Sequence, residues 1–287
     1  LVGGLAVKAA MVPLHGWLPR AMVAPAPVSA LLHAVAVVKA GAFGILRVIY
    51  DLYGIELSVE LGVTTVLAVA ASITIIYGSL RAIAQEELKP RLAFSTISQV
   101  SYVVLGVSLF GPFGTIGALA HLLHQGLMKV TLFFCAGNYA EELGIHRLDE
   151  MDGAGKRMPL TSLAFTVGAL GMIGLPPTAG FITKWYLGMG AIEADMYWVV
   201  AVLVASSTLN AIYFLPIVHR LWFREGPAHG KGQWPKEQSL GRLETHGWLL
   251  WPAVLTAVIS IGAGLLAGLP FSPLDWATRV AVGEYLP

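Results

Sequence analysis

The feature that most constrains this chain is a series of apolar runs, each as long as a helix that crosses a lipid bilayer. A hydrocarbon core about 30 Å thick needs roughly 20 consecutive apolar residues in one helix, whereas the buried strands of a soluble α/β domain would need much shorter runs. Of the 287 residues, 56% are hydrophobic and 12% are charged, against roughly 25% charged in soluble domains. The sequence therefore predicts an all-α integral membrane protein surrounded by the lipid bilayer.

The apolar runs predict about eight transmembrane spans. Their boundaries are Leu1–Pro19, Val28–Tyr50, Leu61–Ala84, Leu92–Phe110, Gly114–Ala140, Leu160–Gly190, Met196–Leu221 and Gly247–Leu269. No shift in composition marks a second domain. Residues 1–269 are therefore predicted to form one membrane domain, and residues 270–287 a C-terminal tail.

Basic residues in the loops predict the orientation of the chain, because loops rich in Lys and Arg stay in the cytoplasm. One side of the predicted spans has only Arg47 and Arg279. The other side has twelve basic residues, namely Arg20, Arg81, Lys89, Arg91, Arg147, Lys156, Arg157, Arg220, Arg224, Lys231, Lys236 and Arg242. This side, with the loop 224–246, is predicted to be cytoplasmic, and the membrane is predicted to be the inner (cytoplasmic) membrane of the cell.

Four lysines lie inside the predicted spans, whereas every acidic residue lies in a loop or at a helix end. These lysines are Lys8, Lys39, Lys129 and Lys184. A lysine at bilayer depth costs about 2.5 to 3.5 kcal/mol on insertion scales and normally faces a cavity or a partner. We therefore expect the four lysines to line a hydrated path, and part of their partners to come from outside this sequence.

Prolines interrupt two of the spans close to two of these lysines. Pro13 follows Lys8 in the first span, and Pro176 and Pro177 precede Lys184 in the sixth. A proline inside a span kinks or breaks the helix, which is tolerated where protein or a watery cavity surrounds the backbone. The alternative for Lys8 is an ordinary kink, with the ammonium reaching the membrane interface. Two broken spans with lysines on opposite sides of the break favour inverted repeats around a transport path.

Polar side chains form a stripe in the fifth span. His121, Gln125 and Lys129 are each four residues apart, so they share one helix face over about 12 Å, with His124 beside them. Because a polar stripe facing lipid would be costly, this face is predicted to line a hydrated interior.

The second span contains His33 and Lys39, which are six residues apart. An ideal α-helix turns them about 240° from each other, so they face different neighbours. For His33 the alternative is a neutral imidazole that is hydrogen-bonded in the bundle, whereas a functional imidazole passes protons between its two nitrogens near neutral pH.

Motifs for nucleotide, flavin or iron–sulfur binding and for nucleophilic hydrolysis are absent from the sequence. Cys135 is the single cysteine. His121 and His124, three residues apart with no acid or thiolate nearby, make a weak metal site. The net charge of +1 favours no nucleic-acid partner. We therefore expect no cofactor, no metal and no catalytic centre in this chain, whose own chemistry is limited to moving protons or cations.

Four stretches carry a resemblance to a known family. They read VKAAMVPLHGWLPRAMVAPAPVSALLHAVAVVKAG, LKPRLAFSTISQVSYVVLG, HLLHQGLMKVTLFFCAG and GLPPTAGFITKWYL. These stretches resemble the proton-translocating antiporter-like proteins, which include the L, M and N subunits of respiratory complex I, the A-type and D-type subunits of Mrp cation/proton antiporters, and subunits of membrane-bound hydrogenases. The form PPTAGFITKWYL is most similar to the Mrp D type.

The resemblance implies that residues 1–269 correspond to spans seven to fourteen of a fourteen-helix inverted-repeat subunit. We then expect a preceding half, with a glutamate that pairs with Lys8, outside this sequence. The resemblance also implies a proton path. In it Lys8 lies at the first broken helix, His33 and Lys39 continue along the central axis, and Lys129 and Lys184 lead toward the exit.

The sequence departs from the family pattern in the fifth span. The family commonly has H-x-x-x-H-x-x-x-K, whereas here the middle position is Gln125, which cannot titrate. Either His124 takes the place of the missing histidine, or ordered water held by Gln125 bridges His121 and Lys129.

The expected function is that of a proton-conducting subunit of the Mrp D type, which exchanges protons for monovalent cations within a complex of other membrane subunits. The first alternative is a proton-pumping subunit of an NADH-quinone oxidoreductase or hydrogenase complex. The second is a scaffold subunit without transport.

Overall fold

The structure is a computed structural model that describes residues 1–226, 234 and 243–285. In this part of the chain the ordered elements are helices, and the only pairing of strand type is an isolated bridge between Glu87 and Arg147. The prediction of an all-α protein is confirmed. Of the basic residues used to predict orientation, Lys231, Lys236 and Arg242 lie outside the described residues.

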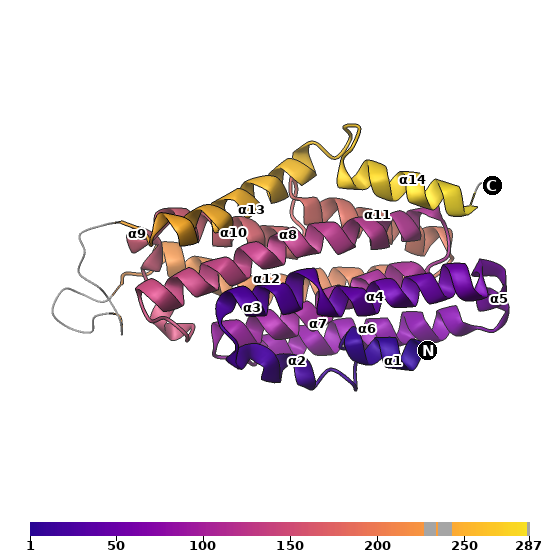
Figure 1. The fold of residues 1–287 in the computed structure, drawn as a ribbon, viewed down its shortest axis with the longest axis horizontal. Coiled ribbons are helices and arrows are strands. Elements are labelled where there is room, and N and C mark those ends of the chain that lie inside the picture. The colour runs from indigo at the N-terminus through magenta and orange to yellow at the C-terminus, as the bar shows by residue number, and fades with distance from the viewer. Residues whose placement is uncertain (227–233, 235–242, 286–287) are drawn as a thin grey trace.

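The long helices run side by side along one axis, with α5 at one end of the bundle and α9 at the other (Figure 1). The α-helices are α1 (Val2–Lys8), α2 (Trp17–Arg20), α3 (Ala26–Ala30), α4 (Val37–Arg47), α5 (Ile55–Glu60), α6 (Val63–Ile83), α7 (Leu88–Ser108), α8 (Pro112–Glu142), α9 (Ala154–Arg157), α10 (Pro159–Ile173), α11 (Ala179–Glu193), α12 (Tyr197–Phe223), α13 (Gly247–Leu265) and α14 (Pro273–Tyr285). Shorter elements are the 3₁₀ turns η1 (Ala21–Val23) and η4 (Asp149–Met151) and the π-helical turns η2 (Leu31–Val35) and η3 (Val48–Tyr53).

Five helical segments in the described part are long and apolar enough to cross a membrane. They are Ala26–Tyr53, Val63–Ile83, Pro112–Glu142, Tyr197–Phe223 and Gly247–Leu265. Helix α7 adds a more polar membrane crossing of 21 residues. The helix pairs α1/α2 and α10/α11 each form one further crossing that is interrupted by a break. These crossings correspond to the eight predicted spans, with boundaries that differ by a few residues.

Both predicted breaks are present. Residues 9–16 separate α1 from α2, and residues 174–178 separate α10 from α11. Each break contains one cis prolyl bond, Val12–Pro13 in the first and Pro176–Pro177 in the second. The two broken spans run in opposite directions through the bundle (Figure 1), as the prediction of inverted repeats requires.

Helices α7 and α8 form the centre of the bundle. Every residue of α7 from Leu92 to Ser108 is buried, because α6 packs on one side of it and α8 on another. Helix α8 has 31 residues and is therefore about 46 Å long. It also contacts α10, α11, α13 and α14. Polar side chains on the α7–α8 interface are consequently shielded from lipid.

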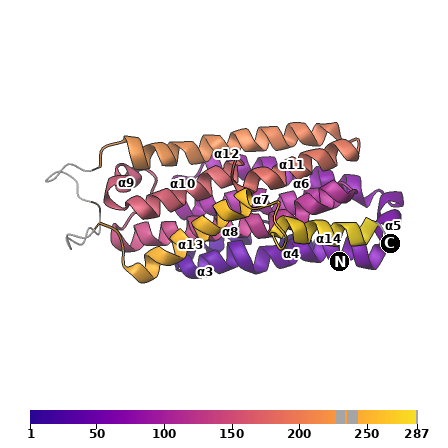
Figure 2. The same ribbon diagram turned by 90° about the horizontal axis from the view of Figure 1, so that it is seen from above.

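The segment predicted as a tail contains helix α14, which follows α13 along α8 (Figure 2). Ala277 and Ala281 pack against Ile116 and Ala120 in the first half of α8. At the end of α14 the backbone N–H of Gly111 donates to the Tyr285 hydroxyl over 3.0 Å. Helix α14 therefore covers α8, and the division of the chain at residue 269 stays a prediction.

Candidate functional site

The polar stripe of α8 faces α7. Lys129, which is fully buried, donates to the carbonyl of Leu92 over 3.0 Å and to the hydroxyl of Ser95. Two helical turns away, the ring of His121 stacks on Tyr102 with 5.2 Å between ring centroids. The three stripe positions of α8 are therefore enclosed by protein, as the cost of exposing them to lipid requires.

Helix α7 presents a matching polar stripe that was not among the residues predicted from the sequence. Its members, Ser95, Gln99 and Tyr102, follow the i, i+4, i+7 spacing of one helix face. Because α7 and α8 are antiparallel, the register that joins Ser95 to Lys129 and Tyr102 to His121 places Gln99 opposite Gln125. We call these two facing stripes the polar seam, which consists of Ser95, Gln99, Tyr102, His121, Gln125 and Lys129.

Several polar atoms of the seam have no hydrogen-bond partner among the described residues. They are both amide atoms of Gln99, Nε2 of Gln125, Nε2 of His121 and the hydroxyl of Tyr102. Buried polar groups in folded proteins are normally hydrogen-bonded, either to protein or to ordered water. The middle of the seam therefore presents buried polar atoms to which ordered water can hydrogen-bond.

Lys184 joins the seam from the second break. Its ammonium donates to the carbonyls of Met172 and Ile173 over 3.0 and 2.7 Å. These are among the last carbonyls of the half-helix α10, which lack intrahelical partners and form the negative end of its dipole. The same ammonium donates to Ser207 over 3.0 Å and lies 5.6 Å from the centre of the Tyr102 ring. Lys184 is thus held by the break and faces one end of the seam.

Lys39 and His33 approach α8 at different turns. The Lys39 ammonium donates to the carbonyl of Leu122 and fills the space beside Gly126, where any side chain would collide with it. His33 is fully buried, lies 5.1 Å from the Phe133 ring and has no partner for either nitrogen among the described residues. His33 lies within the π-helical turn η2, whereas Lys39 lies in α4, so the ideal angle of about 240° does not apply between them.

His124 lies outside the seam. Its Nδ1 donates to the carbonyl of Ala179 at the start of α11 over 3.1 Å. Its position therefore favours the alternative in which water held by Gln125, rather than His124, bridges His121 and Lys129. In the part of the chain that the structure describes, no group of three or more His, Cys, Asp or Glu side chains is arranged to hold a metal ion.

Lys8 is not brought together with the other three lysines. Its side chain is exposed and forms no hydrogen bond or ion pair with the described residues. The first break is held by other groups, since Trp17 Nε1 donates to the Val7 carbonyl over 2.8 Å and the Val12 N–H donates to Thr74 over 3.2 Å. Within this chain, Lys8 faces outward from a well-anchored break.

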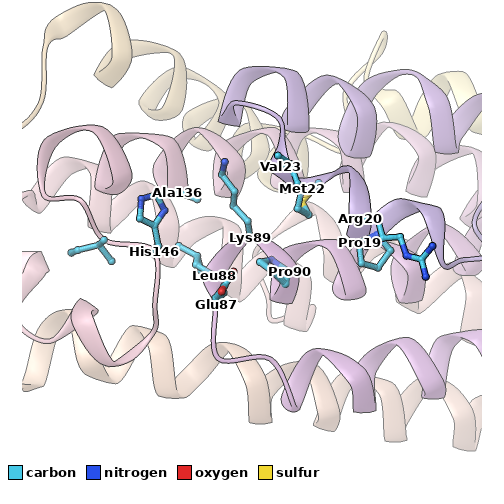
Figure 3. A pocket seen from close by; sticks show the side chains of 11 residues that line it. Pro19, Arg20, Met22, Val23, Glu87, Leu88, Lys89, Pro90, Ala136 and His146 are labelled. Atoms are coloured by element: carbon cyan, nitrogen blue, oxygen red, sulfur yellow. The ribbon is translucent and has the colours of Figure 1, made fainter. Parts of the chain in front are cut away.

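A cavity of about 700 Å³ opens at the end of the bundle where α6 and α7 are joined. Lys89 and His146 stand at this cavity, with Leu88 beside them (Figure 3). Leu88 is one helical turn from Leu92, the residue whose carbonyl binds Lys129. The cavity therefore lies on the predicted cytoplasmic side, at the end of α7 that is nearer to Lys129.

Comparison with known proteins gives consistent matches over this chain. Residues 1–210 match the family model described as "NADH:quinone oxidoreductase/Mrp antiporter, TM". The chain is 40% identical over 270 residues to NADH-quinone oxidoreductase subunit N of Desulforudis audaxviator, covering 92% of this chain and 53% of that protein. It is 39% identical over 195 residues to hydrogenase-4 component B of Escherichia coli, covering 64% and 29%.

A solved structure of the Mrp complex from Dietzia sp. contains a chain with the same fold. The TM-score is 0.84 and the identity 29%, over 100% of this chain and 58% of that one. The chain thus spans about half the length of the subunit N protein and of the Mrp chain, and less than a third of the hydrogenase-4 component. By their names, these three proteins are parts of larger complexes.

Proposed function

The chain belongs to the NADH:quinone oxidoreductase/Mrp antiporter transmembrane family, and on this basis we propose that it conducts protons along the polar seam. In this proposal the chain works inside a complex of membrane subunits in the cytoplasmic membrane. The observation that carries the proposal is the continuous line of buried polar groups between Lys129 and Lys184, which no apolar packing requirement explains.

The seam suits proton transfer because its groups alternate between titratable side chains and groups that hold water. A proton on Lys129 passes to water held between Gln99 and Gln125, and then to Nε2 of His121. A proton leaves the ring from Nδ1, which lies 3.0 Å from the hydroxyl of Thr183, the residue next to Lys184. Each group gains one proton and loses one. His121 is suited to the middle position because imidazole accepts a proton at one nitrogen while it releases one from the other.

The lysines are coupled through their charges. His121 lies within electrostatic range of both Lys184 and Lys39, and no carboxylate joins the seam among the described residues. Two positive charges in a medium of low dielectric constant repel each other strongly. A proton that arrives on one lysine therefore favours release of the proton from the next lysine. The path gains a direction once a step elsewhere in the complex determines which lysine is protonated first.

Replacement of the seam lysine tests this proposal. In the complete complex, Lys129→Leu replaces the titrating ammonium with an apolar side chain that still fills part of the space. Proton flux into sealed vesicles is measured with a pH-sensitive dye. We expect flux to fall roughly 100-fold or more, the loss typical for removal of a proton-transfer group. The control is Lys156→Leu, because Lys156 is an exposed lysine on α9.

Wild-type flux in the assembled Lys129→Leu complex would refute the proposal and would favour the scaffold alternative.

Two finer functions fit the same path. Exchange of protons for monovalent cations, as in a protein of the Mrp D type, is favoured by the stretch PPTAGFITKWYL and by the likeness to the Mrp complex. Proton pumping in an NADH-quinone oxidoreductase is favoured by the 40% identity to subunit N. Vesicles that contain the complex separate them, since a sodium or potassium gradient drives proton flux only in the first case and quinone reduction drives it only in the second.

A further inference from the structure

The first turns of α11 bind both buried histidines of α8. His121 Nδ1 lies 3.0 Å from the Thr183 hydroxyl, and His124 Nδ1 lies 3.1 Å from the Ala179 carbonyl. In both rings the other nitrogen, Nε2, has no hydrogen-bond partner among the described residues. The two rings therefore bind α11 through the same nitrogen, although only His121 belongs to the polar seam.

The partner of each Nδ1 determines which nitrogen of the neutral ring carries the proton. A carbonyl oxygen can only accept, so the proton of His124 is on Nδ1. For His121 the same assignment takes one more step. The Thr183 hydroxyl has a single proton and donates it to the carbonyl of Gly180 over 3.0 Å, so its oxygen accepts from His121. Neutral His121 is therefore protonated at Nδ1, and its Nε2 carries a free lone pair.

The opposite tautomer of His121 is disfavoured by the same contacts. With the proton on Nε2, the lone pairs of Nδ1 and of the Thr183 oxygen would face each other over 3.0 Å. Rotation of the hydroxyl toward Nδ1 would relieve this repulsion, but it would take the proton away from the Gly180 carbonyl. One hydrogen bond is lost in either case, and both side chains are fully buried, where an unmade hydrogen bond is costly.

The His121 ring is also held from a second side. It stacks on Tyr102 of α7 with an angle of 27° between the ring planes. This stacking fixes the plane of the ring, and the bond to Thr183 fixes how the ring is turned within that plane. Because the two nitrogens lie on opposite edges of an imidazole, Nε2 is turned away from α11.

We propose that Thr183 is a positioning residue, which holds His121 in the Nδ1-protonated tautomer so that Nε2 is free to accept a proton from the seam. This inference deepens the proposed function and rests on it, because it assigns a role in the same path to a residue outside the seam. Acceptance at Nε2 followed by release from Nδ1 is the order that transfer from Lys129 toward Lys184 requires. Thr183 acts through the ring of His121 and does not titrate itself.

Substitution of Thr183 separates the hydroxyl from the shape of the side chain. In the complete complex, Thr183→Val keeps the branched shape but removes the acceptor for Nδ1. We expect proton flux to fall about threefold to tenfold, the value of one hydrogen bond. Thr183→Ser keeps the hydroxyl and should retain a flux near that of the wild type. A role in packing alone would give the reverse order, because serine and not valine lacks the methyl group.

The matched control is Thr131→Val on α8. Thr131 is also fully buried, but its hydroxyl donates to the Leu127 carbonyl and to the Thr256 hydroxyl, so it has no part in orienting His121. We expect wild-type flux in this variant.

The tautomer itself is measured by solid-state NMR of the complete complex with isotopically labelled histidine nitrogens. The signals of His121 are identified by their loss in His121→Gln. For the neutral ring we expect a protonated Nδ1 and an unprotonated Nε2 in the wild type, and a gain of the Nε2-protonated form in Thr183→Val. The wild-type spectrum tests the inference even where Thr183→Val does not assemble.

Three results would overturn the role of Thr183. They are an Nε2-protonated His121 in the wild type, wild-type flux in the assembled Thr183→Val complex, and a loss in Thr183→Ser as large as in Thr183→Val. Failure of this inference is distinct from failure of the proposed function, because the spectrum reports the tautomer without any flux, whereas the proposed function fails if Lys129→Leu keeps wild-type flux.

Discussion

The two broken spans share one sequence feature, a lysine close to a proline break, but they differ in how many groups of this chain bind that lysine. At the second break, Lys184 binds two backbone carbonyls and a hydroxyl, and Gly180 packs directly on the backbone of Gly171. At the first break, Lys8 ends a seven-residue helix that has no buried residue and forms no polar contact with the described residues. At the second break, groups of this chain bind the lysine. At the first break, the lysine is exposed and has no polar contact with the described residues.

The difference teaches that a lysine beside a proline break is not by itself a site. The second break becomes one because two carbonyls of α10 and the Ser207 hydroxyl of α12 accept from its lysine, and the Tyr102 ring of α7 lies beside it. The first break contacts α4, α6 and α7, but none of these helices brings a polar group to Lys8 among the described residues. A partner for Lys8, which the resemblance expects to be a glutamate, would complete that site in the same sense.

The largest expected effect comes from removing the two break lysines. In the complete complex, Lys8→Ala and Lys184→Ala should each abolish proton exchange while the complex still assembles, because each removes a titrating group of the proposed path. They should differ in stability. Lys184→Ala also strips a donor from two buried carbonyls, which costs about 1–3 kcal/mol, and thermal unfolding of the purified complex measures this loss.

Equal thermal stability of the two variants would contradict the contrast between the breaks, and wild-type exchange in both would contradict the function of the breaks.

A smaller effect is expected from tightening the second break. A methyl group at Gly180 would overlap the backbone oxygen of Gly171, which side-chain rotation cannot relieve, so Gly180→Ala should destabilise the complex by about 1–3 kcal/mol. The control is Gly188→Ala on the same helix, where a methyl group meets no atom within 4 Å. Thermal unfolding and exchange rate are measured together, and a Gly180→Ala complex as stable as the control would show that the close packing is dispensable.

The smallest effects should come from the side chains that brace each break. His124 braces the second by its bond to Ala179, and Thr74 braces the first by its bond to Val12. His124→Leu and Thr74→Val should each cost about 0.5–1.5 kcal/mol, the net value of one hydrogen bond, and leave exchange within a few-fold of wild type. A loss of proton exchange in His124→Leu as large as in Lys184→Ala would place His124 in the proton path. It would then support the alternative that His124 takes the place of the missing histidine.

Much of the architecture was predictable because charge and proline are strong signals in apolar sequence. The spans, the two breaks and the stripe of His121, Gln125 and Lys129 follow from length, from Pro13 and Pro176, and from the helical period. The partner stripe on α7 was not predicted, because Ser95, Gln99 and Tyr102 are uncharged and common inside bundles. Their spacing of i, i+4, i+7 was nevertheless visible and is the signal that identifies them.

Other features depend on contacts that no local pattern contains. The π-helical turn before Lys39 arises where the second span packs on α8, and residue propensities do not specify such a turn. Helix α14 carries the ion pair of Asp275 with Arg279 and too little apolar length to indicate a span, so its packing on α8 was not foreseen. The contact between Ser207 of α12 and Lys184 is likewise one that sequence spacing does not give.

The central claim is that water and polar side chains join Lys129 to Lys184 through the polar seam. A cryo-electron microscopy map of the complete complex, at a resolution that shows ordered water, tests this claim most directly. The account predicts water density hydrogen-bonded to Gln99, Gln125 and Nε2 of His121, continuous with the two lysines. A seam in which these atoms are closed off by apolar side chains, with no density between Lys129 and His121, would contradict it.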